Sequence, residues 1–179
     1  MLWLSADALR TVLHHCRRER PREACGWLAG RWQPPGGPEG GRRGVTALGL
    51  RAYPMANVAE DPIRRYLMDP EEQFAVLRTM RRRGEELVGI YHSHPATAPV
   101  PSATDIDLAY TKDAVYLIVS LAGPRPELRA WWLDCDTRRV EEVAVQMERD
   151  DGAGGGEDGG GERGGADHYG EREAPHLSR

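Results

Sequence analysis

The chain has few cysteines and no long apolar runs. Its three cysteines, Cys16, Cys25 and Cys135, form no Cys-x-x-Cys pair, and so sparse and odd a set is not a disulfide framework. We therefore expect a reducing, cytoplasmic compartment. No stretch approaches the roughly 18 apolar residues that a membrane span requires. The N-terminus lacks the basic segment that begins a signal peptide.

The chain also lacks an excess of basic charge. It has 24 lysines and arginines against 28 aspartates and glutamates, for a formal net charge of -4. This balance gives no general attraction for nucleic-acid phosphates or acidic lipids, so we expect neither nucleic-acid nor membrane partners. The one basic run, Arg81 to Arg83, is explained as a helix end, because cations are stabilising at a helix C-terminus.

Length and composition predict one domain followed by a tail. A chain of 179 residues is long enough for one sizeable core. Near Glu148 the composition changes sharply, and glycine and charged residues predominate beyond it. Such a segment cannot bury enough apolar surface to offset the entropy lost on ordering. We predict a domain over 1–148 and a disordered, Gly-rich tail over 149–179.

Helices are predicted where a capping residue precedes an apolar stripe. Ser5 can cap a first helix that ends before Pro21, and its inward stripe would be Leu9, Val12, Leu13 and Cys16. A short third helix is expected over 101–110.

The second predicted helix has the clearest start in the chain. Asp69 is its cap, Pro70 its first helical residue, and Glu72 stands three residues after the cap. Gly84 closes it. Its inward residues are predicted to be Phe74, Leu77 and Met80.

Strands are predicted over 25–30, 45–53, 66–68, 87–91, 115–121, 128–133 and 140–147. The Gly- and Pro-rich stretch 33–44 is expected to be a flexible loop between the first two strands. The segment 115–121 is apolar throughout, which indicates burial on both faces. This order of elements predicts one α/β domain with a mixed, mostly antiparallel sheet.

Two histidines end the strand that begins at Leu87. His92 and His94 are two residues apart, so in a strand they project from the same face, roughly 6.6 Å apart along the chain. Two imidazoles so placed can bind one metal ion. Pro95 cannot continue a central ladder, so we expect the strand to end there and the pair to lie at a sheet edge. A bare His-x-His also fits a half-exposed strand end without a metal.

A serine and an aspartate follow at close range. Asp105 would lie in the first turn of the short helix, where its carboxylate could face the histidines as a third ligand. Two histidines and one carboxylate with an open fourth position are typical of catalytic zinc. The alternative is a capping box, in which Ser102 caps the helix and Asp105 is its third residue. The two interpretations compete for the same carboxylate.

These motifs together resemble a known family. The stretch HSHPATAPVPSATD (92–105) matches the signature of the JAMM, or MPN-plus, metalloproteases, which is His-x-His-Pro followed by Ser-x-x-Asp. That family has an upstream glutamate, and Glu23 in PREACGWLAG (21–30) matches it. The segments MDPEEQ, GEELVGIYHSHP and AVYLIVSL are similar to bacterial members, so the resemblance covers roughly 5–147.

The resemblance implies a single-domain, cytidine-deaminase-like fold and a zinc peptidase. His92, His94 and Asp105 would bind one Zn²⁺, Glu23 would be the general base, and Ser102 would donate a hydrogen bond to the oxyanion. The implied substrate is a ubiquitin-like sulfur-carrier protein, cut after its C-terminal Gly-Gly. A Gly-Gly tail could add as a strand beside the sheet edge. A homodimer is a further implied alternative.

Other interpretations stay open. The chain could be a non-catalytic module that binds a ubiquitin-like partner, or a zinc hydrolase of small amides or phosphoesters. A Cys–His protease built on Cys25 and His92 would leave His94 and Asp105 unused. A buried small hydrophobe is the simpler role for all three cysteines. Glu23 alone could equally be one more solvated charge.

Overall fold

The structure, a computed structural model, describes residues 1–33 and 46–148. The predicted tail (149–179) and nearly all of the predicted loop (33–44) lie outside these residues. In chain order the elements are β1 (Leu2–Leu4), α1 (Ala6–Glu19), β2 (Cys25–Gln33), β3 (Thr46–Met55), α2 (Pro70–Arg83), β4 (Glu86–His94), α3 (Ala103–Asp107), β5 (Val115–Ser120), β6 (Glu127–Asp134), β7 (Arg139–Val143) and β8 (Val145–Met147). No helix in the described ranges is long and apolar enough to cross a bilayer.

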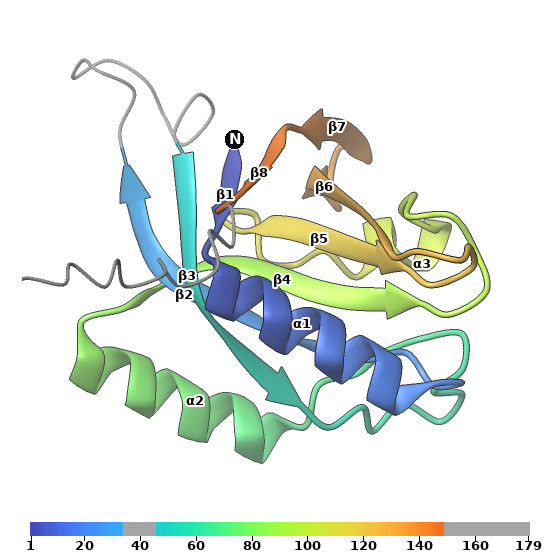
Figure 1. The fold of residues 1–179 in the computed structure, drawn as a ribbon, viewed down its shortest axis with the longest axis horizontal. Coiled ribbons are helices and arrows are strands. Elements are labelled where there is room, and N and C mark those ends of the chain that lie inside the picture. The colour runs from blue at the N-terminus through green and yellow to red at the C-terminus, as the bar shows by residue number, and fades with distance from the viewer. Residues whose placement is uncertain (34–45, 149–179) are drawn as a thin grey trace, which may run out of the picture.

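One sheet runs through the domain in the order β7-β6-β5-β4-β2-β3-β1-β8 (Figure 1). Strand β4 lies near its middle, antiparallel to β2 and parallel to β5. The remaining neighbours pair antiparallel, except that β1 is parallel to both β3 and β8. The predicted mixed, mostly antiparallel α/β architecture is confirmed.

The strand predictions differ from the structure in three places. Strand β1 was not predicted. The expected strand over 140–147 is divided at Ala144, because β7 pairs with β6 whereas β8 pairs with β1. The expected strand over 66–68 is only a single bridge between Met68 and Asn57. Strands of three residues carry too little periodicity to be recognised in a sequence.

The predicted helix caps are confirmed. The side chain of Ser5 accepts a hydrogen bond from Ala8 N, and the Asp69 carboxylate accepts from the first amides of α2. Gly84 ends α2 with φ +64°, a conformation that suits glycine. Glu72 does not complete a capping box, because its carboxylate accepts a hydrogen bond from Ala56 N instead.

The prediction that Phe74 faces inward is wrong, since its side chain is 63% exposed. Met80 is buried, and Val76 and Leu77 pack against the core. The inward stripe therefore consists of positions 76, 77 and 80. At helical spacing the residue of this stripe one turn earlier is 73, not 74. The Phe74 ring lies on the surface, with the Arg78 guanidinium 6.0 Å from its centre.

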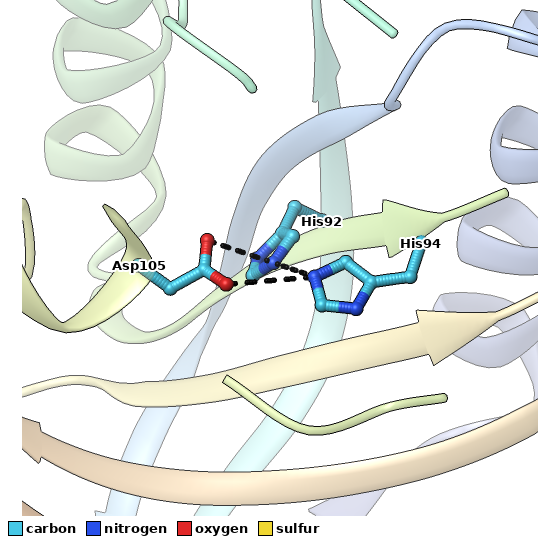
Figure 2. Close-up of side chains that lie close together, drawn as sticks. All are labelled: His92, His94 and Asp105. Atoms are coloured by element: carbon cyan, nitrogen blue, oxygen red, sulfur yellow. Dashed lines mark hydrogen bonds and ion pairs between the residues drawn. The ribbon is translucent and has the colours of Figure 1, made fainter. Parts of the chain in front are cut away.

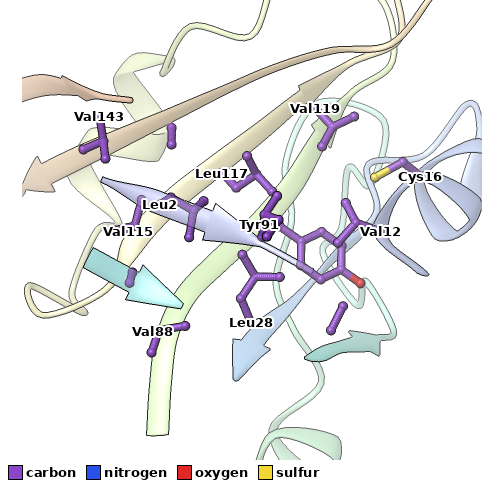
Figure 3. Close-up of a cluster of buried hydrophobic side chains, with 14 of the residues drawn as sticks. Leu2, Val12, Cys16, Leu28, Val88, Tyr91, Val115, Leu117, Val119 and Val143 are labelled. Atoms are coloured by element: carbon purple, nitrogen blue, oxygen red, sulfur yellow. The ribbon is translucent and has the colours of Figure 1, made fainter. Parts of the chain in front are cut away.

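Each face of the sheet carries its own core. Helix α1 covers one face, where Val12 and Cys16 pack against Leu28, Tyr91 and other side chains of the central strands (Figure 3). Helices α2 and α3 cover the other face, whose core includes Met80. Every residue of β5 is buried, as predicted for a strand covered on both sides. The histidines of β4 project toward the α2 and α3 face, and this placement decides where a site can form.

Candidate metal centre

His92 and His94 lie at the C-terminal end of strand β4. Their exposed fractions are 0% and 6%. The prediction that they lie at a sheet edge is wrong, because His92 pairs with Cys25 on one side and Ile118 on the other. The pair instead occupies the C-terminal end of an interior strand. Rigid strands on both sides therefore fix the direction of the two imidazoles.

Helix α3 brings the carboxylate of Asp105 to this strand end. Asp105 Oδ2 accepts a hydrogen bond from Ser102 N at 2.7 Å, and Ser102 Oγ accepts one from Asp105 N at 3.2 Å. The capping box is therefore present. The same carboxylate also faces both histidines, so the two interpretations of Asp105 are compatible. The cap holds the carboxylate in place, and its remaining lone pairs point at the imidazoles.

Three donor atoms converge between these side chains (Figure 2). His92 Nε2 and His94 Nε2 are 3.0 Å apart, Asp105 Oδ1 lies 3.3 Å from His92 Nε2, and Asp105 Oδ2 lies 3.5 Å from His94 Nε2. Donors bound tetrahedrally to zinc at about 2.0–2.1 Å are separated by about 3.3 Å. The three side chains therefore fit one zinc-sized ion, and they form a metal-binding group in the described part of the chain.

Two of the three groups, the neutral His92 imidazole and the ionised Asp105 carboxylate, are in the form that binds a cation. His94 Nδ1 lies 2.9 Å from Ala98 O, which places a proton on Nδ1 and directs Nε2 at the group. Burial lowers the pKa of His94, but hydrogen bonds with Asp105 and Ala98 O outweigh it and raise that pKa, so a bound cation would displace a proton from Nε2. Burial lowers the pKa of His92, which favours its neutral form. Burial alone would raise the pKa of Asp105, but hydrogen bonds with His92 and His94 outweigh it and hold that pKa well below its usual range.

Glu23 lies beside this group, in the turn that precedes β2 rather than in the strand itself. Its side chain is buried, with 7% exposed. Its pKa is raised to about 7, chiefly by burial; His94 lowers this pKa, and Asp105 and Asp61 raise it, by smaller amounts. The bland interpretation of Glu23 as a solvated charge is therefore wrong.

A cavity of about 600 Å³ opens onto the group, and its volume is typical of a ligand site. Three of the five residues singled out in the sequence, Glu23, His94 and Ser102, line this cavity. A fourth, Asp105, contacts His94. The remaining one, His92, is fully buried beneath. The structure thus brings all five predicted site residues together.

The alternative nucleophile Cys25 is not activated. It is fully buried, and its thiol points toward the carbonyls of Met55 and Ala56. Burial raises the pKa of the Cys25 thiol to about 12, whereas a catalytic thiol needs a lowered pKa. Cys16 is buried as predicted, but Cys135 is only half-buried in a turn, so the expectation for that cysteine is wrong.

Two further residues support the site and were not singled out in the sequence. The ring of Tyr66 stacks on the His92 imidazole, with ring centres 4.6 Å apart. The buried amide of Asn57 donates to Glu23 O, Pro62 O and Arg65 O. No local sequence pattern predicts the role of Tyr66 or Asn57, because both roles depend on how the loop 56–69 folds back onto the sheet.

Asn57 ties the Glu23 turn to this loop. Its Oδ1 accepts hydrogen bonds from Ala59 N and Leu67 N, and Glu23 N donates to Pro62 O at 2.7 Å. The position of Glu23 is therefore fixed through its backbone on both sides. The loop that carries Tyr66 is fixed by the same amide.

Replacing Asn57 with alanine is expected to lower the free energy of unfolding by about 2–4 kcal/mol, because several buried backbone groups lose their partners. Urea denaturation of the purified variant measures this. The matched control is Glu60→Ala, an exposed residue of the same loop, which should stay within about 0.5 kcal/mol of the parent. Equal stability of the two variants would contradict the role of Asn57.

Residues 5–134 match the family described as prokaryotic homologs of the JAB domain. The chain belongs to this family. The predicted family resemblance is thereby confirmed. The fold described above for residues 1–33 and 46–148 is that of a JAB domain.

Named relatives of this JAB domain are similar over most of its length. A desampylase from Haloferax volcanii is 42% identical over 151 residues, which cover 82% of this chain and 96% of the relative. A CysO-cysteine peptidase from Mycobacterium tuberculosis is 42% identical over 149 residues, covering 83% of this chain and 88% of the relative. A solution structure of a protein from Desulfitobacterium hafniense superposes with TM-score 0.68 at 34% identity, covering 83% and 93% of the two chains.

Proposed function

We propose that this JAB domain is a zinc-dependent peptidase that hydrolyses the amide bond after the C-terminal Gly-Gly of a ubiquitin-like sulfur-carrier protein. The observation that carries the proposal is the convergence of His92, His94 and Asp105 on one point, beside a buried Glu23 at the wall of a cavity. A set of ligands without a neighbouring acid would suit a structural ion equally well. The adjacent glutamate is what favours catalysis.

His92, His94 and Asp105 would hold the ion beside the cavity that His94 lines. When bound, zinc supplies Lewis-acid chemistry that lowers the pKa of water and polarises a carbonyl. Two nitrogen donors and one carboxylate suit zinc better than magnesium or calcium, which prefer oxygen donors. The Ala98 carbonyl orients His94 for this role through Nδ1.

Glu23 would act as the general base and then as the general acid. It would take a proton from the attacking water and deliver it to the leaving nitrogen of the amide. A general base works best when its pKa lies near the working pH, and burial places that of Glu23 at about 7. Its backbone contacts with Pro62 and Asn57 keep it at the cavity wall.

Ser102 would stabilise the developing oxyanion. Its Oγ accepts the capping hydrogen bond from Asp105 N, so the hydroxyl hydrogen stays available as a donor. The side chain lines the same cavity as Glu23 and His94. A donor already held in place by a helix cap needs little reorganisation when negative charge forms on a carbonyl oxygen.

The proposed substrate follows from the named relatives and from the shape of the site. The relatives are named a desampylase, a CysO-cysteine peptidase and, in Thermus thermophilus, a probable TtuB-protein conjugate cleaving protease. The family resemblance implies a ubiquitin-like sulfur carrier as the substrate. A Gly-Gly tail has no side chains and can enter a narrow cavity. Addition to a sheet edge does not fit, since the edge strands in the described sheet, β7 and β8, carry none of the site residues.

Cleavage is tested with zinc-loaded protein and carrier proteins extended beyond Gly-Gly by one residue or a short peptide. Intact mass should show the extension released at the Gly-Gly bond. The Glu23→Gln protein is the control for a contaminating protease. If zinc is bound but small model amides turn over faster than every carrier fusion, the chain is a small-amide hydrolase instead. If a carrier binds equally well to the parent and to the Glu23→Gln protein and is never cut, the chain is a binding module.

A further inference from the structure

The cavity beside the candidate centre has a charged wall that the proposed chemistry does not use. Besides Glu23, His94 and Ser102, its lining includes two arginines, Arg20 and Arg64. They come from separate segments, one from the end of α1 and one from the loop 56–69. Neither arginine takes part in activating water or stabilising an oxyanion, so their presence in the same cavity calls for another role.

Within residues 1–33 and 46–148, no carboxylate forms an ion pair with either arginine. Arg20 donates to the backbone carbonyls of Pro95 and Leu121, which are neutral groups. These bonds hold its guanidinium against the residue that follows His94. Among the described residues, the Arg64 side chain makes no hydrogen bond or ion pair, although Asp61 lies three positions earlier in the same loop. An arginine presents five donors, and an anion is the partner that satisfies them best.

The proposed substrate must supply that anion either on the carrier side or on the leaving side of the scissile amide bond. The Gly-Gly tail contributes only neutral peptide groups at the scissile bond. The leaving side is different, because a single amino acid joined through its α-amine carries a free carboxylate a few atoms from the scissile nitrogen. An amine from the side chain of an internal lysine brings no carboxylate so near. Arginine binds carboxylates through paired, charge-assisted hydrogen bonds.

We propose that Arg64, which lines the same cavity as Arg20, binds the free α-carboxylate of the leaving residue. The inference rests on the proposed peptidase function and narrows it. The domain then prefers carriers that end in Gly-Gly plus one amino acid over branched conjugates of internal lysines. Ile63 and Pro21 line the same cavity and give the side chain of the leaving residue an apolar surface.

The test is a matched pair of substrates. One carrier is prepared as Gly-Gly-Cys with a free C-terminal carboxylate and as the same sequence with a C-terminal carboxamide. Every other group is shared, so acidic residues of the carrier and the cysteine thiol cannot cause a difference. For the parent protein we expect kcat/KM to be about 10- to 100-fold higher for the acid, the range for hydrogen bonds to a charged partner. Added salt should reduce this ratio.

Arg64→Gln should bring the ratio of acid to carboxamide to within about twofold, through loss of activity on the acid alone. Arg65→Gln is the matched control. It removes the same charge from the next residue, whose exposed side chain does not line the cavity. Its ratio should equal that of the parent.

Two results would overturn the inference while leaving the proposed function intact. These are equal cleavage of acid and carboxamide by the parent, and an unchanged preference in Arg64→Gln. If the zinc-loaded parent cuts neither substrate, nor a branched lysine conjugate of the same carrier, the proposed function itself is wrong. The two failures are therefore distinguishable in one series of measurements.

Discussion

Asp105→Asn is expected to abolish zinc retention and to reduce carrier cleavage to background, while the domain still folds. The asparagine carbonyl can accept the hydrogen bond from Ser102 N that now goes to Asp105 Oδ2, so the helix cap is kept. The charge that faces His92 and His94 is lost. The change therefore separates the two roles of one carboxylate, which alanine at this position would not do.

Zinc content after dialysis and thermal unfolding with and without zinc measure the effect. With zinc at about 1,000 times its Kd, binding should raise the free energy of unfolding of the parent by about 4 kcal/mol. The variant should lose most of this gain. Removing zinc from the parent with a chelator should have the same effect on cleavage, and adding zinc back should restore it in the parent only.

The matched control is Asp107→Asn. Asp107 lies in the same short helix, is about half exposed, and pairs with Arg138 on the surface. This variant should keep zinc and activity at parental levels. Stoichiometric zinc in Asp105→Asn, or equal zinc loss in both variants, would contradict the role of Asp105 as a ligand.

The main parts of this site could be predicted because local chain geometry decides them. Alternation along a strand puts His92 and His94 on one face. The helix cap at Ser102 places Asp105 in the first turn of the helix that follows. These rules need no knowledge of distant segments. The structure accordingly shows the three donor atoms of the predicted group facing one another.

Other parts depend on contacts between distant segments and could not be predicted. Which strands flank β4 is a matter of pairing, so the sequence suggested an edge where the structure has an interior strand. Asn57 acts through backbone groups of residues as far away as Glu23. Phe74 was placed inward because it is apolar, yet helical spacing from Met80 puts it on the surface. Tertiary packing decides the first two cases, whereas the surface position of Phe74 follows from helical spacing that the sequence itself contains.

Glu23→Gln is expected to lower kcat for carrier cleavage by about 10²–10⁴-fold, the range for loss of a general base. Glutamine keeps the size of the side chain and the backbone contacts to Pro62 and Asn57. Zinc content should therefore stay at the parental level, in contrast to Asp105→Asn. The control is Glu60→Gln, an exposed acid of the adjacent loop, which should leave kcat unchanged.

The same variant should change how the stability of the metal-free protein depends on pH. The pKa of Glu23 is raised by burial from 4.5 to about 7 in the folded state. Between these values the folded protein binds a proton that the unfolded chain releases, so Glu23 makes stability fall as pH rises through this window. Glutamine does not titrate. Relative to the parent, Glu23→Gln should therefore gain up to about 3 kcal/mol between pH 4.5 and 7, and no more above.

Urea denaturation in the presence of a chelator at pH 4.5, 6 and 8 measures this difference. A stability gain together with lost turnover is what a buried catalytic acid predicts, because its ionised form is held in place at a cost to the fold. A merely structural Glu23, paired and satisfied, would instead destabilise the protein when replaced. If Glu23→Gln is less stable than the parent at pH 8 and still cuts carriers at the parental rate, Glu23 is not the base, and another group must accept the proton from water.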